Sequence, residues 1–190
     1  DALRFGEPGP NGHDLPVLPV AEGLQNVLVP TMAQGRGPEQ LESLLPEYIP
    51  AQRWFGEQGH TLEAVAIEDA VRLEADPAVY LSVLRVTLDE EEVFYTLPLM
   101  AKPESEAQSI LDGHPTAALT WLEINGTGER RLLYDATVDP SFWATLFEWW
   151  QGGSKGRSLK GVYTAEPSQD AKGEVPESVD LLSGEQSNTD

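Results

Sequence analysis

Residues 184–189 read Gly-Glu-Gln-Ser-Asn-Thr and are the one segment of this chain whose residue types suit phosphate binding. A strand followed by glycine and small polar residues can present backbone N–H groups and hydroxyls to the phosphates of a nucleotide. We expect such a strand at residues 179–183. The pattern alone indicates little, because polar chain ends are common. Phosphoryl transfer also needs a cation and metal-binding carboxylates, and the pattern supplies neither.

Metal chemistry finds little support in the sequence. The three histidines, His13, His60 and His114, are far apart and have no second histidine or paired carboxylate at metal-ligand spacing. We interpret them as surface histidines. The acidic residues 89–92 could bind a hard cation, but they lack the spaced oxygen ligands of a calcium loop. We expect a solvated hairpin turn there, and no metal ligand in this chain.

Composition excludes other classes of function. The 190 residues include 32 Asp and Glu against 12 Lys and Arg, a net charge of −20. Binding to phosphate backbones needs clustered Lys and Arg, so we expect neither a nucleic-acid nor a membrane partner. The chain has no cysteine, which excludes disulfides and fits a reducing cytoplasm. The acidity is compatible with solubility, a salt-rich cytoplasm or a basic partner.

Residues 1–55 precede the predicted strands and contain a predicted linker and a predicted helix. Residues 1–37 are rich in Gly and Pro and predict an extended linker, with residues 15–20 as an edge strand at best. A helix is predicted at residues 38–45, and we expect Pro50 to end it. Residues 53–55, Arg-Trp-Phe, follow. We expect them to hold this helix on a sheet, with a cation–π contact from the arginine.

The middle of the chain alternates apolar and polar residues with a period of two, which predicts strands. A charged turn at residues 89–92 joins two of them into a hairpin, and residues 125–128 form a second turn. Antiparallel strands beside one helix describe an α+β fold. The predicted strands cover residues 62–69, 79–88, 93–99, 117–124 and 131–135.

Helical periodicity returns after residue 138. Asp139 is the predicted N-cap and Pro140 the first helical residue, and Gly152 follows the end of the helix. Phe142, Leu146 and Trp149 share one stripe, with Trp143 and Trp150 beside it. Aromatic residues at helical spacing usually form core, but this helix could also stack on sugar rings or on a partner protein. Residues 158–165 predict a further strand, and 166–178 a polar linker.

Five ordered segments carry a family resemblance: 45–56 (Leu-Pro-Glu-Tyr-Ile-Pro-Ala-Gln-Arg-Trp-Phe-Gly), 95–99 (Tyr-Thr-Leu-Pro-Leu), 133–136 (Leu-Tyr-Asp-Ala), 139–142 (Asp-Pro-Ser-Phe) and 185–189 (Glu-Gln-Ser-Asn-Thr). Together they resemble bacterial maltokinases, above all those fused to trehalose synthase. The resemblance implies a kinase of the aminoglycoside-phosphotransferase type with an N-terminal cap, in which a cystatin-like curved antiparallel sheet packs on a helix. It divides the chain into a linker (1–37), the cap (38–138) and a helix, a linker and the start of the kinase N-lobe (139–190).

The family transfers the γ-phosphate of ATP to maltose with Mg²⁺ and feeds glycogen-type glucan synthesis. The resemblance therefore implies that the loop faces nucleotide through Gln186, Ser187, Asn188 and Thr189, whereas Asp190 departs from the serine of the family pattern. It also implies that the catalytic and maltose-binding residues lie in a C-terminal lobe outside this chain. We thus expect no catalytic residue here, and a role as a structural or regulatory part of the enzyme. The alternative is a stand-alone module with the cap fold that binds a protein or a sugar.

Overall fold

The computed structural model describes residues 14–20, 37–57, 59–73, 77–158 and 160–167. Within these ranges six strands form one sheet in the order β1-β5-β6-β4-β3-β2. The strands are β1 (Val17–Val20), β2 (Leu62–Leu73), β3 (Val79–Leu88), β4 (Glu91–Pro103), β5 (Ala118–Ile124) and β6 (Arg130–Asp135). A separate two-stranded sheet contains β7 (Lys155–Arg157) and β8 (Val162–Thr164).

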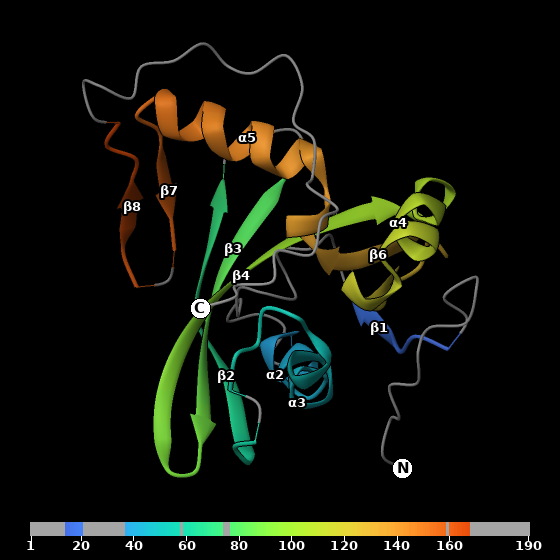
Figure 1. Ribbon diagram of the computed structural model, residues 1–190. Coiled ribbons are helices and arrows are strands. Elements are labelled where there is room, and N and C mark those ends of the chain that lie inside the picture. The colour runs from blue at the N-terminus through green and yellow to red at the C-terminus, as the bar shows by residue number, and fades with distance from the viewer. Residues whose placement is uncertain (1–13, 21–36, 58, 74–76, 159, 168–190) are drawn as a thin grey trace, which may run out of the picture.

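Four α-helices and four short 3₁₀ helices are described with this sheet. Figure 1 shows α5 lying across one end of the long strands, with α2 and α3 beside the lower part of β2. None of the helices in the described ranges is long and apolar enough to cross a membrane. The helices are α2 (Gly37–Glu42), α3 (Leu45–Tyr48), α4 (Gln108–Gly113), α5 (Pro140–Gln151), η1 (Ile49–Ala51), η2 (Glu104–Glu106), η3 (Pro115–Ala117) and η4 (Ala136–Val138).

The predicted α+β class is confirmed, but the sheet is mixed. Strand β1 is an edge strand, as residues 15–20 predicted, and it pairs in parallel with β5, with Val17 opposite Trp121. The other pairs in the sheet are antiparallel. Pro19 is tolerated because β1 has a neighbour on one side only. The register of β2 shifts twice, and such bulges bend a strand and increase its twist.

The central hairpin follows its predicted course closely. Strand β3 has the predicted bounds, whereas β2 and β4 are longer than predicted. The turn contains two residues, Asp89 and Glu90, with φ of 45° and 73°, because Glu91 and Glu92 already belong to β4. Positive φ at both central residues is the geometry of a tight hairpin turn whose twist matches that of its strands. The interpretation of the acidic cluster as a hairpin turn is therefore confirmed.

The predicted helix at residues 38–45 is wrong in its bounds. Helix α2 ends at Glu42, and α3 and η1 then extend the helical segment to Ala51. Pro46 and Pro50 each lie in the first turn of a new helix, where the missing N–H leaves no hydrogen bond unmade. Helix α3 ends at Tyr48, and Pro50 lies in the short turn η1 that closes the helical segment, as its predicted role as a helix end requires. The backbone becomes extended at Gln52.

Apolar side chains form two cores on opposite faces of the sheet. Successive strand residues point to opposite faces: Leu99 belongs to one cluster, and Met100 to the other. The first core packs under α2, α3 and η1 and includes Leu41, Leu44, Leu45, Tyr48, Ile49, Tyr80, Leu84, Leu97, Leu99, Leu119 and Leu133. The second core packs under α4 and α5 and includes Val71, Leu73, Val79, Met100, Ile110, Trp121, Leu132, Tyr134 and Phe142.

The predicted strand at residues 158–165 is confirmed only in its second half, where it forms one strand of a hairpin. Strand β8 lies within this range, and it pairs antiparallel with the unpredicted strand β7. Residues 158 and 161 close the turn between them through the bond from the Ser158 N–H to the Gly161 carbonyl.

Candidate functional site

The four residues predicted to face a nucleotide, Gln186, Ser187, Asn188 and Thr189, lie outside the described residues. Their role therefore stays a prediction. The predicted strand at 179–183 and residues 168–178 of the predicted linker also lie outside them. The candidate site within the described ranges is the region around α5, where buried carboxylates and exposed aromatic side chains meet.

Asp139 is the N-cap of α5, as predicted. Its Oδ1 atom accepts hydrogen bonds from the Ser141 N–H at 2.9 Å and the Ser141 hydroxyl at 2.7 Å. These bonds satisfy a backbone donor that the first turn of a helix leaves without a partner. Pro140 follows at the first helical position, where its lack of an N–H is harmless.

The other oxygen of Asp139 ties α5 to the sheet. Oδ2 accepts a hydrogen bond from the Tyr134 hydroxyl of β6 at 2.7 Å and lies 2.7 Å from the Lys102 ammonium of β4. Burial alone would raise the pKa of Asp139, but the hydrogen bonds from Lys102, Ser141 and Tyr134 outweigh it and lower this pKa from 3.8 to about 2. Burial and the bond to Asp139 raise the pKa of Tyr134. Asp139 is therefore a charged anchor rather than an acid or base near neutral pH.

Asp135 joins the same region to the first helical segment. Its Oδ2 atom accepts a hydrogen bond from the Trp54 indole at 3.0 Å, and Oδ1 accepts two from Thr137 at 2.9 and 2.7 Å. Trp54 and Phe55 both lie against the Tyr95 ring. The prediction that Trp54 and Phe55 hold the helix on the sheet is thus confirmed.

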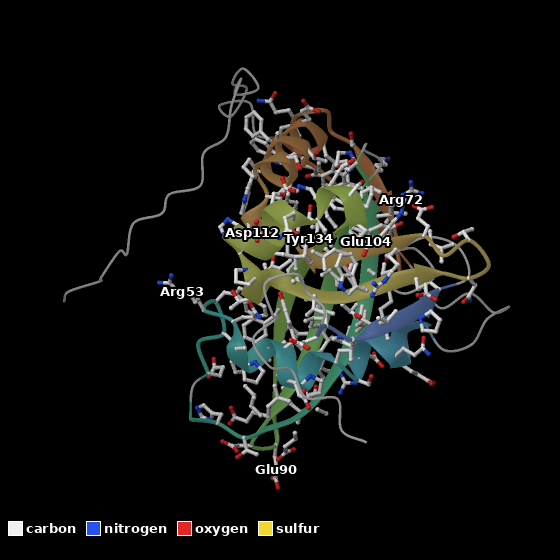
Figure 2. All side chains as sticks on the ribbon, turned by 90° about the vertical axis from the view of Figure 1, so that its right-hand side faces the viewer. Arg53, Arg72, Glu90, Glu104, Asp112 and Tyr134 are labelled. Atoms are coloured by element: carbon white, nitrogen blue, oxygen red, sulfur yellow. The ribbon has the colours of Figure 1, made fainter. Side chains whose placement is uncertain are left out.

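The predicted role of Arg53 in that anchor is wrong. Its side chain is exposed and points away from the body of the protein (Figure 2). The cation–π pairs found among the described residues are Lys102 with Tyr134 and Arg130 with Trp121. The Trp54 indole N–H donates instead to Asp135 of β6.

A third carboxylate, Asp69 on β2, holds the β7–β8 hairpin beside α5. Asp69 is 4% exposed, and its Oδ2 atom accepts hydrogen bonds from the Ser158 hydroxyl at 2.6 Å and the Tyr163 hydroxyl at 3.2 Å. Lys160 pairs with Glu68 on the same strand. A Cβ at Gly156 would lie 2.4 Å from a Val71 methyl carbon. Glycine is therefore required there for the close approach of β7 to β2.

The α5 helix divides its aromatic residues between two sides. Phe142 is buried in the second core, and Leu146 and Trp149 pack against that core, as the predicted stripe required. On the other side a shallow pocket is lined by Trp143, Leu146, Phe147 and Trp150, almost entirely by carbon atoms. We call these four residues the α5 groove. Trp143 is 39% exposed, so the aromatic residues of this helix are only partly core, and the open alternative of a binding surface keeps its basis.

Histidines and metals add no second site within the described ranges. No group of three or more His, Cys, Asp or Glu residues placed to hold a metal occurs in the described part of the chain. His60 lies 2.9 Å from the Asp89 carboxylate at the base of the hairpin turn, where its side chain is half exposed. This contact agrees with the interpretation of His60 as a surface histidine, and His13 lies outside the described residues.

Residues 152–156, Gly-Gly-Ser-Lys-Gly, match the Gly-x-Ser-x-Gly pattern of serine hydrolases. That pattern implies a nucleophile only where it turns from a strand into a helix. Here it follows the end of α5 and leads into β7, the reverse order. The Ser154 N–H donates to the Trp149 carbonyl, so this serine belongs to the helix end.

Comparison with known proteins finds a family whose members resemble the segment that contains most of the sheet. Residues 48–139 match the family model described as the maltokinase N-terminal cap domain. This part of the chain is similar to that family of cap domains. The matched segment begins at the end of α3, contains strands β2 to β6, and ends at the N-cap of α5.

A curated relative extends the likeness beyond the cap domain. The chain is 30% identical over 176 residues to a protein named trehalose synthase from Thermus thermophilus. The alignment covers 93% of this chain but 16% of that relative, so the chain corresponds to a small part of its length. The predicted division into a linker, a cap and the start of an N-lobe stays a prediction.

Two anchors of the sheet were not predicted from the sequence. Asp135 was not expected to bind Trp54, which lies 81 positions away, and Asp69 was not expected to bind Ser158 and Tyr163. The signal that could have pointed to Asp69 is a carboxylate close to the apolar residues 70, 71 and 73 of one strand. A buried carboxylate requires hydrogen-bond donors nearby.

Proposed function

We propose that this chain is the cap and the beginning of the N-lobe of a maltokinase, which transfers the γ-phosphate of ATP to maltose and gives maltose 1-phosphate. The observation that carries the proposal is the match of residues 48–139 to the maltokinase cap domain. The reaction would take place in the cytoplasm and supply trehalose and glycogen-type glucan metabolism. The trehalose synthase of Thermus thermophilus supports a fused or associated trehalose synthase as a partner.

In this proposal the chain supplies the nucleotide loop and its support, but no catalytic residue. Gln186, Ser187, Asn188 and Thr189 would bind the phosphates of ATP through hydroxyls and backbone N–H groups. Mg²⁺ and its carboxylate ligands, the catalytic base and the maltose site would belong to the C-terminal lobe of the full-length enzyme. Phosphoryl transfer depends on positioning and charge neutralisation, so the cap would act by holding the N-lobe in a fixed geometry.

The described contacts support such a supporting role. Asp139, Asp135 and Asp69 tie α5, the Trp54 segment and the β7–β8 hairpin to a single sheet. The chain that continues from β8 towards residue 184 thereby starts from a rigid point. A rigid support is what a phosphate loop needs, because small displacements of a reacting phosphate are costly.

The test compares ATP-dependent phosphorylation of maltose by the 190-residue chain and by a longer polypeptide of the same gene that carries the kinase lobe. We expect activity in the longer form alone. Replacing Ser187 and Thr189 with alanine in the longer form should raise KM for ATP and leave KM for maltose unchanged. Activity in the 190-residue chain, or an unchanged KM for ATP, contradicts the proposal.

The second candidate is a stand-alone binding module with the cap fold, which the exposed α5 groove favours. A sugar would need hydroxyl partners as well as aromatic rings. The Trp143 indole N–H already donates to the Thr137 carbonyl at 2.9 Å, and the groove lining is almost all carbon. The groove therefore favours an apolar protein segment over maltose or glucan. Quenching of tryptophan fluorescence by maltose would reverse this preference.

A further inference from the structure

The α5 groove is an apolar surface on an otherwise acidic protein. Its four residues recur at positions i, i+3, i+4 and i+7 of one helix, a spacing that forms a continuous stripe. The rings of Phe147 and Trp150 lie 5.9 Å apart, and the Trp143 indole is held in place by its bond to Thr137. Such a surface is preformed for an apolar partner.

The described chain leaves the β7–β8 hairpin beside the end of α5. The Ala165 N–H donates to the Ser154 carbonyl at 2.9 Å, and the Ser154 N–H donates to the Trp149 carbonyl at 3.3 Å. Ser154 therefore links Ala165 to the last turn of α5 through these two hydrogen bonds. The 23 residues from 168 to 190 continue from this place.

Those residues contain one segment with the right chemistry for the groove. Residues 179–182 read Val-Asp-Leu-Leu, in the middle of a stretch that is otherwise mostly polar. In an extended conformation Val179 and Leu181 point to the same side, and Asp180 points to the other. The segment would thus place two apolar side chains on α5 and leave its carboxylate in solvent.

The chain is long enough to bring this segment back over α5. The eleven residues from 168 to 178 can span up to about 36 Å when extended. Helix α5 has 12 residues and is about 18 Å long. The linker therefore reaches every part of the groove, and its local origin makes the effective concentration of the segment high.

We propose that residues 179–182 of this same chain dock on the α5 groove through Val179 and Leu181. Docking would place the loop at 184–189 directly after a segment held on α5. The meaning of that placement for ATP rests on the proposed function, whereas the docking itself does not. It would give the cap a specific task, which is to position the phosphate loop through α5.

The test uses the whole 190-residue chain with its five tryptophans labelled with fluorine. The resonances of Trp143 and Trp150 are assigned by replacing each with phenylalanine. Their exposure is measured by the relaxation that a soluble paramagnetic gadolinium complex induces. The test variant is Val179→Asp with Leu181→Asp. The matched control, Ser178→Asp with Ser183→Asp, adds the same two charges to the same segment without removing an apolar side chain.

We expect Trp143 and Trp150 to be protected in the parent chain and in the control, and exposed in the test variant. Burying one such side chain contributes roughly tenfold to an equilibrium, so the docking constant should fall by about 100-fold. The resonances of Trp54 and Trp121 should stay unchanged, which shows that the fold is intact. Equal exposure of Trp143 in all three proteins would overturn the proposal.

Two further outcomes would also overturn it. Protection that depends on protein concentration would assign the groove to a second copy of the chain. Protection that appears only after addition of maltose or a longer glucan would assign it to a sugar. Failure of docking is separate from failure of the kinase proposal, because the first is measured on this chain without nucleotide and the second on the longer polypeptide.

Discussion

The two faces of the sheet are covered by helices in different ways. On the first face α2, α3 and η1 contribute apolar side chains, and the buried Tyr48 hydroxyl donates to the Ala117 carbonyl. On the second face α5 contributes one fully buried aromatic residue and is held by a charged pair, Asp139 with Lys102. The first face depends on hydrophobic burial, and the second depends in addition on electrostatics.

This difference predicts how each face responds to mutation and to pH. Burial of apolar area contributes stability that does not depend on pH. A buried ion pair contributes only while both partners are charged, and removing one partner leaves the other without compensation. The second face should therefore be the one whose stability changes in acid.

The largest effect is expected from Asp139→Ala. The free energy of unfolding should fall by about 4 kcal/mol, of which about 3 comes from leaving Lys102 and Tyr134 without their acceptor and about 1 from the lost N-cap. Urea denaturation measures this change. The double variant Asp139→Ala with Lys102→Ala should recover part of the loss, because no lone charge remains. A loss below about 1 kcal/mol would mean that water screens the pair.

Trp54→Ala tests the first face. Removal of the indole leaves a cavity against Tyr95 and frees Asp135, and the free energy of unfolding should fall by about 3 kcal/mol. Trp54→Phe keeps most of the packing and loses the hydrogen bond, at a cost of about 1 kcal/mol. The melting temperature should follow the same order, and a melting temperature unchanged in Trp54→Ala would remove this residue from the anchor.

The pH dependence distinguishes the two faces. The pKa of Asp139 is about 2 in the folded protein, below its ordinary 3.8. Its contribution is thus fully present above pH 3.8 and is lost as the pH falls towards 2. This loss amounts to about 2 kcal/mol. Urea denaturation from pH 5 downwards should show it in the parent and in Trp54→Phe. In Asp139→Asn the slope should be smaller, because only other carboxylates with lowered pKa values, such as Glu68 and Asp89, remain. The same slope in Asp139→Asn would assign the pH dependence to other groups.

The smallest effect is a gain at the β3–β4 turn, which lies at the far end of the hairpin (Figure 2). Glu90 has a φ of 73°, which is unfavourable for a residue with a Cβ. Glu90→Gly should raise the free energy of unfolding by about 1 kcal/mol. Glu90→Ala serves as the control, since it removes the charge but keeps the strain. Neither change should alter the acid dependence that belongs to Asp139.

Local pattern predicted much of this fold. The bounds of β3, the N-cap of α5 and the stripe of Phe142, Leu146 and Trp149 were all predicted, because each depends on residues within a few positions of one another. The helix at residues 38–45 was predicted with the wrong bounds. Its prolines suit the first turn of a helix as well as they suit a helix end.

The candidate site was predicted only in part. Asp139 was predicted as a cap, but its second role as the partner of Lys102 joins residues 37 positions apart. Both partners are common surface residue types, and nothing near either one in the sequence points to the other. Asp135 and Trp54 are 81 positions apart, and the hydrogen bond between them was not predicted either. Contacts of this kind depend on which strands become neighbours, and no short segment of the sequence predicts that pairing.

The sequence by itself determined the α+β class and the acidity, since both follow from local composition and periodicity, and it contains the ordered segments that resemble a maltokinase cap. The tertiary structure alone decided that β1 pairs in parallel with β5, that Arg53 points into solvent, and that α5 turns Trp143 outwards. The physical reason is that a helix or strand has its apolar stripe before it folds, but what covers that stripe depends on residues far away in the chain.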